Sequence, residues 1–312
     1  MKILITGGAG FIGSTVAEQL LNLGHNVFVI DNLSTGHLSN LDERAVFFEA
    51  DIKSDQLNNL FNQIKPDQVL HFAAQVNVNR SIEDPLLDEE TNIKGTVNIL
   101  ENCKKHGVKK IIYASSAAVY GVPQNLPIAE NHTIDPISFY GISKFVPEQY
   151  IKTYAALYGL KYTILRYSNV FGPKQDHVGE GGVVSIFINK MLKNESLIIY
   201  GNGEQTRDFI YVQDVVSANI AAIDSEINGV FNVSTNTTIS LNELVRVMSE
   251  FNSRKMELTY RESRVGDIIH SCLDNSSAIS HLNWKPKYSL EEALKDTFDY
   301  YRRETINNEF IL

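Results

Sequence analysis

The stretch "KILITGGAGFIG", residues 2–13, decides the fold. Its first five residues form an apolar run typical of a buried strand, and an amphipathic segment over 11–23 follows it. Gly7, Gly10 and Gly13 permit a tight turn between strand and helix and let the backbone approach a pyrophosphate, while the helix start at Phe11 and Ile12 offers unpaired N–H groups to an anion. The stretch predicts a strand, turn and helix that bind a dinucleotide.

Short β-branched runs alternate with longer amphipathic segments through the first half of the chain. Strands that read as continuous apolar runs and are separated by helices are typical of a parallel sheet covered on both faces. We therefore predict an α/β protein with a Rossmann-type doubly wound parallel sheet. The expected strands are 2–6, 26–30, 45–50, 68–73, 109–115 and 161–167, and the expected helices are 11–23, 53–63, 85–106 and 138–158.

The second half of the chain has a looser pattern, which begins with the glycine-rich "FGPKQDHVGEGG" at 171–182. We expect residues 1–170 to form an NAD-binding domain to which 210–235 return. Residues 171–209 and 236–312 are expected to form a smaller, interleaved substrate-binding domain.

Composition narrows the possible functions. A formal charge of −9 and a pI near 5.4 argue against a broad nucleic-acid-binding face, and no apolar run is long enough to span a membrane. Cys103 and Cys272 have no zinc or redox spacing, so we expect buried thiols, no disulfide and a cytoplasmic location. The eight histidines show no metal-ligand spacing, and His71 is expected to be a hydrogen-bonded core residue.

Asp31 ends the second expected strand, eighteen residues after Gly13. A carboxylate there accepts hydrogen bonds from the adenosine ribose and repels the extra phosphate of NADP, so NAD is favoured. The residues at 32–36, which include Asn32, Ser34 and Gly36, contain no Lys or Arg. Two further strand ends could contact the cofactor or could be simple strand ends: Asp51 with Ile52, and Ala73 with Ala74.

Chemistry is expected beyond the fifth strand, which runs into Ser115 and Ser116. In "YGISK" (140–144), Tyr140 and Lys144 lie four residues apart and therefore share one face of a helix. By itself this spacing also fits an ordinary surface pair. A cation beside a phenol lowers the pKa of the phenol, which would make the tyrosine a better base.

Nine segments in order resemble the extended short-chain dehydrogenase/reductase family, most closely its members that invert C4 of a UDP-hexose. They are "GGAGFIG", "DNLSTG", "HFAAQVNVNRSIEDP", "NIKGTVNIL", "SSAAVYG", "YGISK", "LRYSNVFGP", "GNGEQTRDFIYV" and "RVGD", and they cover residues 7–267. The resemblance implies that Tyr140 is the acid/base, that Lys144 binds the nicotinamide ribose and stabilises the phenolate, and that Ser116 binds the same sugar oxygen. It also implies cofactor contacts by Phe72, Gln75, Asn92, Ser115 and Tyr167.

Substrate contacts are likewise implied by the resemblance. Arg207 and Arg264 are expected to bind the nucleotide diphosphate, Asp267 the uridine ribose, and Asn169 the sugar diphosphate. Val183, Val184 and Tyr200 are expected to line the nucleotide pocket. A small residue, Ser271, stands where hexose-restricted members carry tyrosine, which leaves room for an N-acetyl group.

The expected reaction is NAD-dependent 4-epimerisation of a UDP-sugar through a 4-keto sugar. Ala117 and Ala118 carry no proton for a dehydratase or a decarboxylase to use. Three alternatives remain: an oxidoreductase, an epimerase of UDP-glucuronate, and a non-catalytic NAD-sensing regulator. The helices at 85–106 and 138–158 resemble those that form a dimer interface in relatives, so we expect a homodimer.

Overall fold

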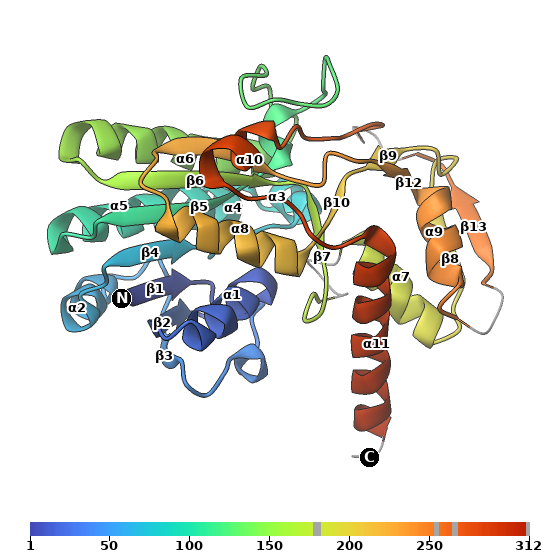
Figure 1. Ribbon diagram of the computed structural model, residues 1–312, viewed down its shortest axis with the longest axis horizontal. Coiled ribbons are helices and arrows are strands. Elements are labelled where there is room, and N and C mark those ends of the chain that lie inside the picture. Colours follow the sequence, from blue (N-terminus) through green and yellow to red (C-terminus); the bar gives the residue numbers. More distant parts are fainter. Residues whose placement is uncertain (177–181, 253–255, 264–267, 310–312) are drawn as a thin grey trace.

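The computed structural model describes residues 1–176, 182–252, 256–263 and 268–309. Its centre is a seven-stranded parallel sheet in the order β11-β6-β5-β4-β1-β2-β3 (Figure 1). The predicted doubly wound sheet is therefore confirmed. Its strands are β1 (Lys2–Thr6), β2 (Asn26–Asp31), β3 (Val46–Glu49), β4 (Gln68–His71), β5 (Lys110–Ser116), β6 (Lys161–Tyr167) and β11 (Gly229–Val233).

Helices cover both faces of this sheet, and alternate side chains of each strand supply the two cores. Ile3 and Ile5 pack with α1 (Phe11–Asn22), α8 (Val212–Asp224) and α10 (Ser276–Leu282). Leu4 points the other way and packs with the core under the opposite helices. These helices are α2 (Leu57–Ile64), α5 (Gly95–His106) and α6 (Phe139–Tyr158).

The expected helix at 85–106 is interrupted. It comprises α4 (Pro85–Glu89), a π-helical turn (Glu90–Lys94) and α5, and it is preceded by α3 (Val78–Glu83). The π turn contains Asn92, whose side chain is almost completely buried and makes several hydrogen bonds. Periodicity could not reveal this turn, because the apolar spacing continues through it.

A second, smaller group of elements lies beside the carboxyl ends of the sheet strands (Figure 1). Its strands form two-stranded pairs: β7 (Asn169–Phe171) with β10 (Phe209–Tyr211), β8 (Leu197–Tyr200) with β13 (Leu258–Arg261), and β9 (Thr206–Arg207) with β12 (Ile239–Ser240). Its helices are α7 (Val183–Leu192), α9 (Leu241–Ser249) and α11 (Leu290–Glu309), which share a third core.

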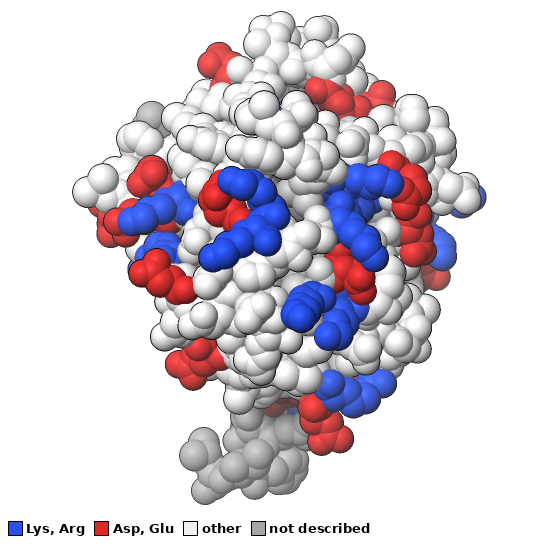
Figure 2. Space-filling view, turned by 90° about the vertical axis from the view of Figure 1, so that its left-hand side faces the viewer, with Lys and Arg blue, Asp and Glu red and all other residues white. Residues whose placement is uncertain are grey.

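Between these elements the chain returns to the main sheet through α8 and β11. Both cysteines are free and buried, as expected. No helix in the described ranges has the length and apolarity needed to cross a membrane. On the face shown in Figure 2, basic and acidic side chains are interspersed rather than gathered into a field of one sign.

Candidate active site

A cavity of about 300 Å³ lies at the carboxyl ends of the central strands. In this sheet order β1 lies between β4 and β2. Strands β2 and β3 are added on one side of β1 and β4, β5 and β6 on the other, and this switch in strand order leaves a crevice for a ligand. Most of the predicted cofactor and catalytic residues line the cavity: Gly7, Gly10, Phe11, Ile12, Gly13, Asp31, Asn32, Ser34, Gly36, Asp51, Ile52, Phe72, Ala73, Ala74, Ser115, Ser116, Tyr140, Lys144 and Tyr167.

The glycine-rich turn forms one wall and has no room for side chains. Gly7 has φ +70°, and a Cβ there would lie 2.5 Å from the backbone nitrogen of Ala73. A Cβ on Gly13 would lie 2.2 Å from the carbonyl oxygen of Gly7. The bare backbone and the N-terminus of α1 therefore face the cavity, as a pyrophosphate requires.

Asp31 shapes the adenosine end of the cavity. Its carboxylate is 8% exposed and accepts hydrogen bonds from the backbone N–H groups of Ala9 and Leu33, each at 2.9 Å. These bonds tie the end of β2 to the glycine turn and fix the carboxylate at the cavity wall. Among the described residues that line the cavity, Lys144 is the only lysine or arginine. The described lining beside Asp31 therefore holds no lysine or arginine to pair with the additional phosphate of NADP, and Lys53, outside the lining, contacts Asp51 at 3.8 Å.

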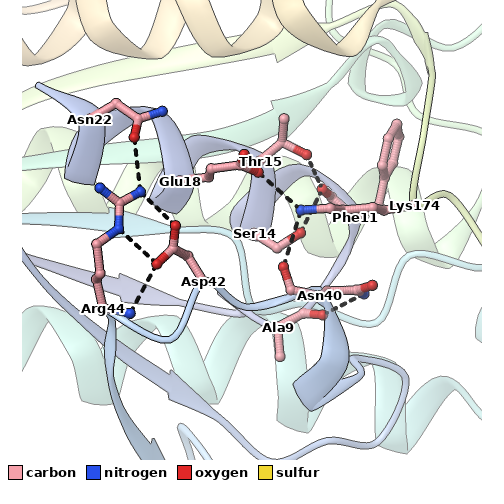
Figure 3. A network of polar contacts seen from close by, with 10 residues as sticks. All are labelled: Ala9, Phe11, Ser14, Thr15, Glu18, Asn22, Asn40, Asp42, Arg44 and Lys174. Atoms are coloured by element: carbon pink, nitrogen blue, oxygen red, sulfur yellow. Dashed lines mark hydrogen bonds and ion pairs between the residues drawn. The ribbon is translucent and has the colours of Figure 1, made fainter. Parts of the chain in front are cut away.

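A polar network holds the outside of the glycine turn (Figure 3). Asn40 donates through Nδ2 to the carbonyl of Ala9 at 3.0 Å. Lys174, from the segment after β7, reaches across α1 and contacts Glu18 at 3.2 Å and the carbonyl of Asn40 at 3.1 Å. This lysine therefore fastens the segment that precedes Gln175 and Asp176 to the dinucleotide-binding turn.

Tyr140 and Lys144 lie in the first turns of α6. Ser138 caps this helix and accepts a hydrogen bond from the N–H of Gly141, and the N–H of Tyr140 donates to Ser81 Oγ at 3.2 Å. These contacts fix where the helix begins. The two side chains consequently project into the same cavity from one helical face.

The Lys144 side chain is nearly sealed from solvent, with 3% of the residue exposed. Its ammonium lies 4.7 Å from the centre of the Tyr113 ring, a cation–π contact. Burial lowers the pKa of Lys144 to about 8, while the negative charges of Glu148 and Asp88 oppose that decrease. The lysine is thus poised to gain or lose its charge in the range where enzymes work.

Ser115 and Ser116 make different contacts. Ser115 is 3% exposed and donates through Oγ to Glu148 Oε1 at 2.6 Å. Ser116 Oγ accepts from the N–H of Ala118 at 3.2 Å and keeps its own proton for another acceptor. Ser116 is therefore the serine that can donate to a bound ligand, as the resemblance implied.

Gln75 and Asn92, expected at the cofactor, lie behind the cavity and do not line it. Asn92 accepts from the N–H of Gln75 at 2.7 Å and donates to its carbonyl at 2.9 Å. It also donates to Ser143 Oγ at 2.8 Å. These contacts support the loop after β4 against α6, so the two residues shape the wall without forming it.

The expected substrate residues are spread over the smaller group of elements and do not line this cavity: Asn169, Val183, Val184, Tyr200, Arg207 and Ser271. Arg207 lines a separate hollow of about 560 Å³ beside β10 and the start of α11. The N–H of Ser271 donates to the carbonyl of Thr206 at 3.2 Å, which brings Ser271 next to the Arg207 strand. Arg264 and Asp267 lie outside the described residues.

His71 is a core residue, as expected. Thr96 Oγ1 donates to the carbonyl of Asn92, so it must accept from His71 Nε2 at 2.9 Å; Nδ1 then accepts from Thr6 Oγ1 at 2.6 Å. Complete burial, together with the smaller effect of the Lys144 charge, lowers the pKa of His71 to about 3. The imidazole is neutral and supports the strand ends under the glycine turn. The described residues contain no cluster of side chains suited to a metal ion.

Sequence reasoning missed ten residues that line the cavity. They include Thr91 and Val76 beside the loop after β4, and Gln175 and Asp176 after β7. Gln175 is 9% exposed and donates through Nε2 to the carbonyl of Val170 at 3.1 Å. The glycine-rich composition of 171–182 marked an irregular segment, but it gave no indication that Gln175 and Asp176 reach the cavity.

A Gly-rich turn on β1, an acidic residue ending β2, and a Ser, Tyr and Lys set that lines the same cavity define a dinucleotide-dependent enzyme of the short-chain dehydrogenase/reductase type. A model of the NAD dependent epimerase/dehydratase family matches residues 3–234. The chain belongs to this family.

The similar proteins match this chain over nearly its whole length. UDP-glucose 4-epimerase of Mycolicibacterium smegmatis is 37% identical, over 98% of this chain and all of that protein. The crystal structure of UDP-glucose 4-epimerase of Thermotoga maritima with UDP-glucose has a TM-score of 0.96 at 44% identity and covers 98% of this chain and 100% of that one. The structure of UDP-N-acetylglucosamine 4-epimerase of Methanobrevibacter ruminantium, in complex with UDP-N-acetylmuramic acid, has a TM-score of 0.93 at 36% identity. The match covers 97% of this chain and 98% of that one.

Proposed function

We propose that this protein catalyses NAD-dependent 4-epimerisation of a UDP-hexose. The observation that carries the proposal is the presence of Ser116, Tyr140 and Lys144 around one cavity that also contains the glycine turn and Asp31. No other proton-transfer group stands at positions 117 and 118, both of which are alanine. This set suits a reaction that moves one hydride and one hydroxyl proton, and it does not suit elimination.

Bound NAD would supply the acceptor for the hydride from C4 of the sugar and the donor for its return. Tyr140 removes the proton of the C4 hydroxyl and gives it back at the end of the cycle. Ser116 donates a hydrogen bond to the same sugar oxygen, and the ammonium of Lys144 stabilises the phenolate. The glycine turn and Asp31 would hold the pyrophosphate and the adenosine ribose.

The nucleotide half of the substrate is proposed to bind to the smaller group of elements. Arg207 and Asn169 lie on β9 and β7, at the border with the main sheet, and Arg207 would contact the diphosphate. With the diphosphate anchored, the sugar can turn and present its other face to the same reactive groups. Ser271 lies next to the Arg207 strand. If this small residue stands where the resemblance implies, it would leave space at C2, so UDP-GlcNAc and UDP-GalNAc are proposed as substrates together with UDP-Glc and UDP-Gal.

The proposal is tested with the purified protein. It is incubated with UDP-Glc, UDP-Gal, UDP-GlcNAc, UDP-GalNAc and UDP-GlcA, and the C4 configuration is followed by NMR. We expect interconversion of the neutral sugars without net consumption of NAD. Net formation of NADH, or conversion of UDP-GlcA alone, would contradict the proposal. Ser271→Tyr should raise KM for the N-acetylated sugars more than for UDP-Glc.

We further propose a homodimer. The support comes from α6, where Ile142, Tyr150, Leu157 and Tyr158 are exposed, together with Leu86 of α4. The expected contribution of α5 has less support, because none of the exposed large apolar side chains in the described chain belongs to Gly95–His106. Sedimentation at micromolar concentration that gave only monomer would contradict a dimer. Two free, buried thiols fit the proposed cytoplasmic location.

A further inference from the structure

An ion pair with no role in the steps above lies directly behind the Ser116 strand. Glu148 of α6 is 0% exposed and Arg166 of β6 is 2% exposed. Arg166 donates from Nε to Glu148 Oε1 at 2.9 Å and from Nη2 to Oε2 at 2.6 Å, a bidentate pair. Ser115 of β5 adds the third hydrogen bond to this carboxylate, so Glu148 joins three elements.

Glu148 also stands in register with the groups at the cavity. It follows Lys144 by four residues and Tyr140 by eight, which places all three on one face of α6. The far side of the Arg166 guanidinium is occupied as well: Nη1 donates to the hydroxyl of Tyr120 at 2.9 Å. That hydroxyl in turn donates to Asn232 of β11 at 2.7 Å. The carboxylate therefore has no freedom to move away from the lysine.

Burial of such a pair is costly, and an apolar pair of similar volume would often be as stable. The Glu148–Arg166 pair lies close to the buried ammonium of Lys144, so we ask whether its charge acts on that lysine. Other groups near Lys144 do not supply the fixed negative charge that Glu148 does: His71 of β4 is neutral, Tyr113 of β5 offers its ring to the ammonium and its hydroxyl to the Lys144 carbonyl, and Tyr140 shares the cavity as the proposed acid/base. Asp88 of α4 is the second carboxylate that acts on the lysine, after Glu148.

We propose that Glu148, held by Arg166 and Ser115, is a positioning residue whose fixed negative charge keeps the Lys144 ammonium charged at the cavity. Arg166 anchors the carboxylate through Nε and Nη2, and its Nη1 donates to the hydroxyl of Tyr120. Burial works against the charge of Arg166, but the hydrogen bonds and negative charge of Glu148 raise the pKa of Arg166 well above its usual range. The proposal rests on the function given above for Lys144.

The first test measures Lys144 directly and requires no substrate. The protein is labelled with 13Cε-lysine, and the Lys144 signal is assigned by its loss in Lys144→Met. We expect Glu148→Gln to lower the midpoint of the Lys144 titration by about one pH unit, because an opposite charge nearby favours the charged form. Glu148→Asp, which keeps the charge, should restore most of the difference. An unchanged midpoint in Glu148→Gln would overturn the proposal.

A double variant separates charge from packing. Glu148→Gln leaves Arg166 without its partner, whereas Glu148→Gln with Arg166→Met removes both charges and returns a neutral interior. We expect the double variant to regain thermal stability while its Lys144 midpoint remains low. If the midpoint returns to the wild-type value together with stability, the pair serves packing alone. Glu101→Gln is the matched control, because Glu101 contacts Tyr154 of the same helix and should leave the midpoint unchanged.

The second test uses the reaction. Lys144 acts in its charged form, so activity falls as pH rises through its pKa. A lower pKa in Glu148→Gln therefore moves the alkaline limb of the kcat profile to lower pH by about one unit, roughly a tenfold loss on that limb. If kcat of Glu148→Gln fell equally at every pH and the alkaline limb stayed at the wild-type pH, the proposal would be contradicted. If the wild-type protein turns over no UDP-sugar, the proposed function fails, but the NMR titration still decides the link between Glu148 and Lys144.

Discussion

Ser115 and Ser116 are neighbours on β5, yet their hydroxyls serve different partners: Ser115 donates to the buried Glu148, and Ser116 retains a proton for the cavity. The difference follows from the alternation of side chains along a strand. It separates a serine whose hydroxyl is bonded to a core carboxylate from one whose proton remains available at the cavity.

Replacement of the two serines should therefore have opposite consequences. Ser116→Ala should lower kcat by about tenfold to a hundredfold, because it removes a hydrogen bond to the reacting oxygen. Ser115→Ala should lower the free energy of unfolding by about 1–3 kcal/mol, because a buried carboxylate loses a donor. Steady-state kinetics and urea unfolding of both variants measure the two effects. If both variants lost kcat to the same extent and both kept the wild-type free energy of unfolding, this division of roles would be contradicted.

Tyr140→Phe tests the acid/base role. Loss of a general acid/base costs about a hundredfold to ten-thousandfold in rate. We expect kcat to fall within that range, while the affinity for UDP and for NAD remains within a few fold, since the phenyl ring still fills its place. Isothermal titration with UDP checks binding. Near-normal turnover by the variant would end the assignment of Tyr140.

His71 predicts a pH-dependent stability. Its pKa is about 3 in the folded protein against 6.5 for the free residue, so the folded state binds the proton less well than the unfolded state. The stability that His71 contributes is present above pH 6.5 and is lost as pH falls from 6.5 toward 3. Between pH 6.5 and 5 this loss is roughly 2 kcal/mol.

Urea unfolding at several pH values measures that loss, and His71→Gln supplies the comparison. The variant keeps a neutral polar side chain and cannot take up a proton, so its stability should depend less steeply on pH over the same interval. Its absolute stability is expected to be lower, because glutamine cannot reproduce both bonds to Thr6 and Thr96. Parallel pH dependences would show that His71 does not titrate in this way.

The contacts of Lys174 are expected to slow the exchange of NAD. Its contacts with Glu18 and Asn40 fasten the segment leading to Gln175 and Asp176 over the cavity. Lys174→Met should speed the dissociation of NAD severalfold, because the segment can then open more readily. The release is followed by exchange of bound NAD against a fluorescent analogue. Lys104→Met, which removes a surface pair with Glu101, should leave the rate unchanged.

The doubly wound parallel sheet and the residues that line its cavity could be predicted because both depend on local signals. Apolar runs, the glycine spacing and Asp31 lie within short segments, and the resulting side chains meet at one edge of a parallel sheet. Tyr140 and Lys144 share one helix, so their spacing placed them side by side. The roles of these residues came from a family resemblance and not from the spacing.

Other features depend on contacts between distant segments and could not be predicted. The π turn at Asn92 depends on the backbone of Gln75 and on Ser143 of another helix. The buried partnership of Glu148 with Arg166 joins residues that read separately as a helix glutamate and a strand arginine. Gln175 and Asp176 reach the cavity only because the chain folds back after β7.

The parallel pairing of β7 with β10 has a consequence for engineering and for evolution. The chain leaves the main sheet, builds part of the smaller unit up to β10, comes back through α8 and β11, and then leaves again. If the smaller unit holds the nucleotide sugar as proposed, a graft that transfers sugar preference from a relative must carry two separate pieces of sequence at once. Recombination at a single crossover would join mismatched halves, so such enzymes are expected to change their preferred sugar by point substitution rather than by exchange of a module.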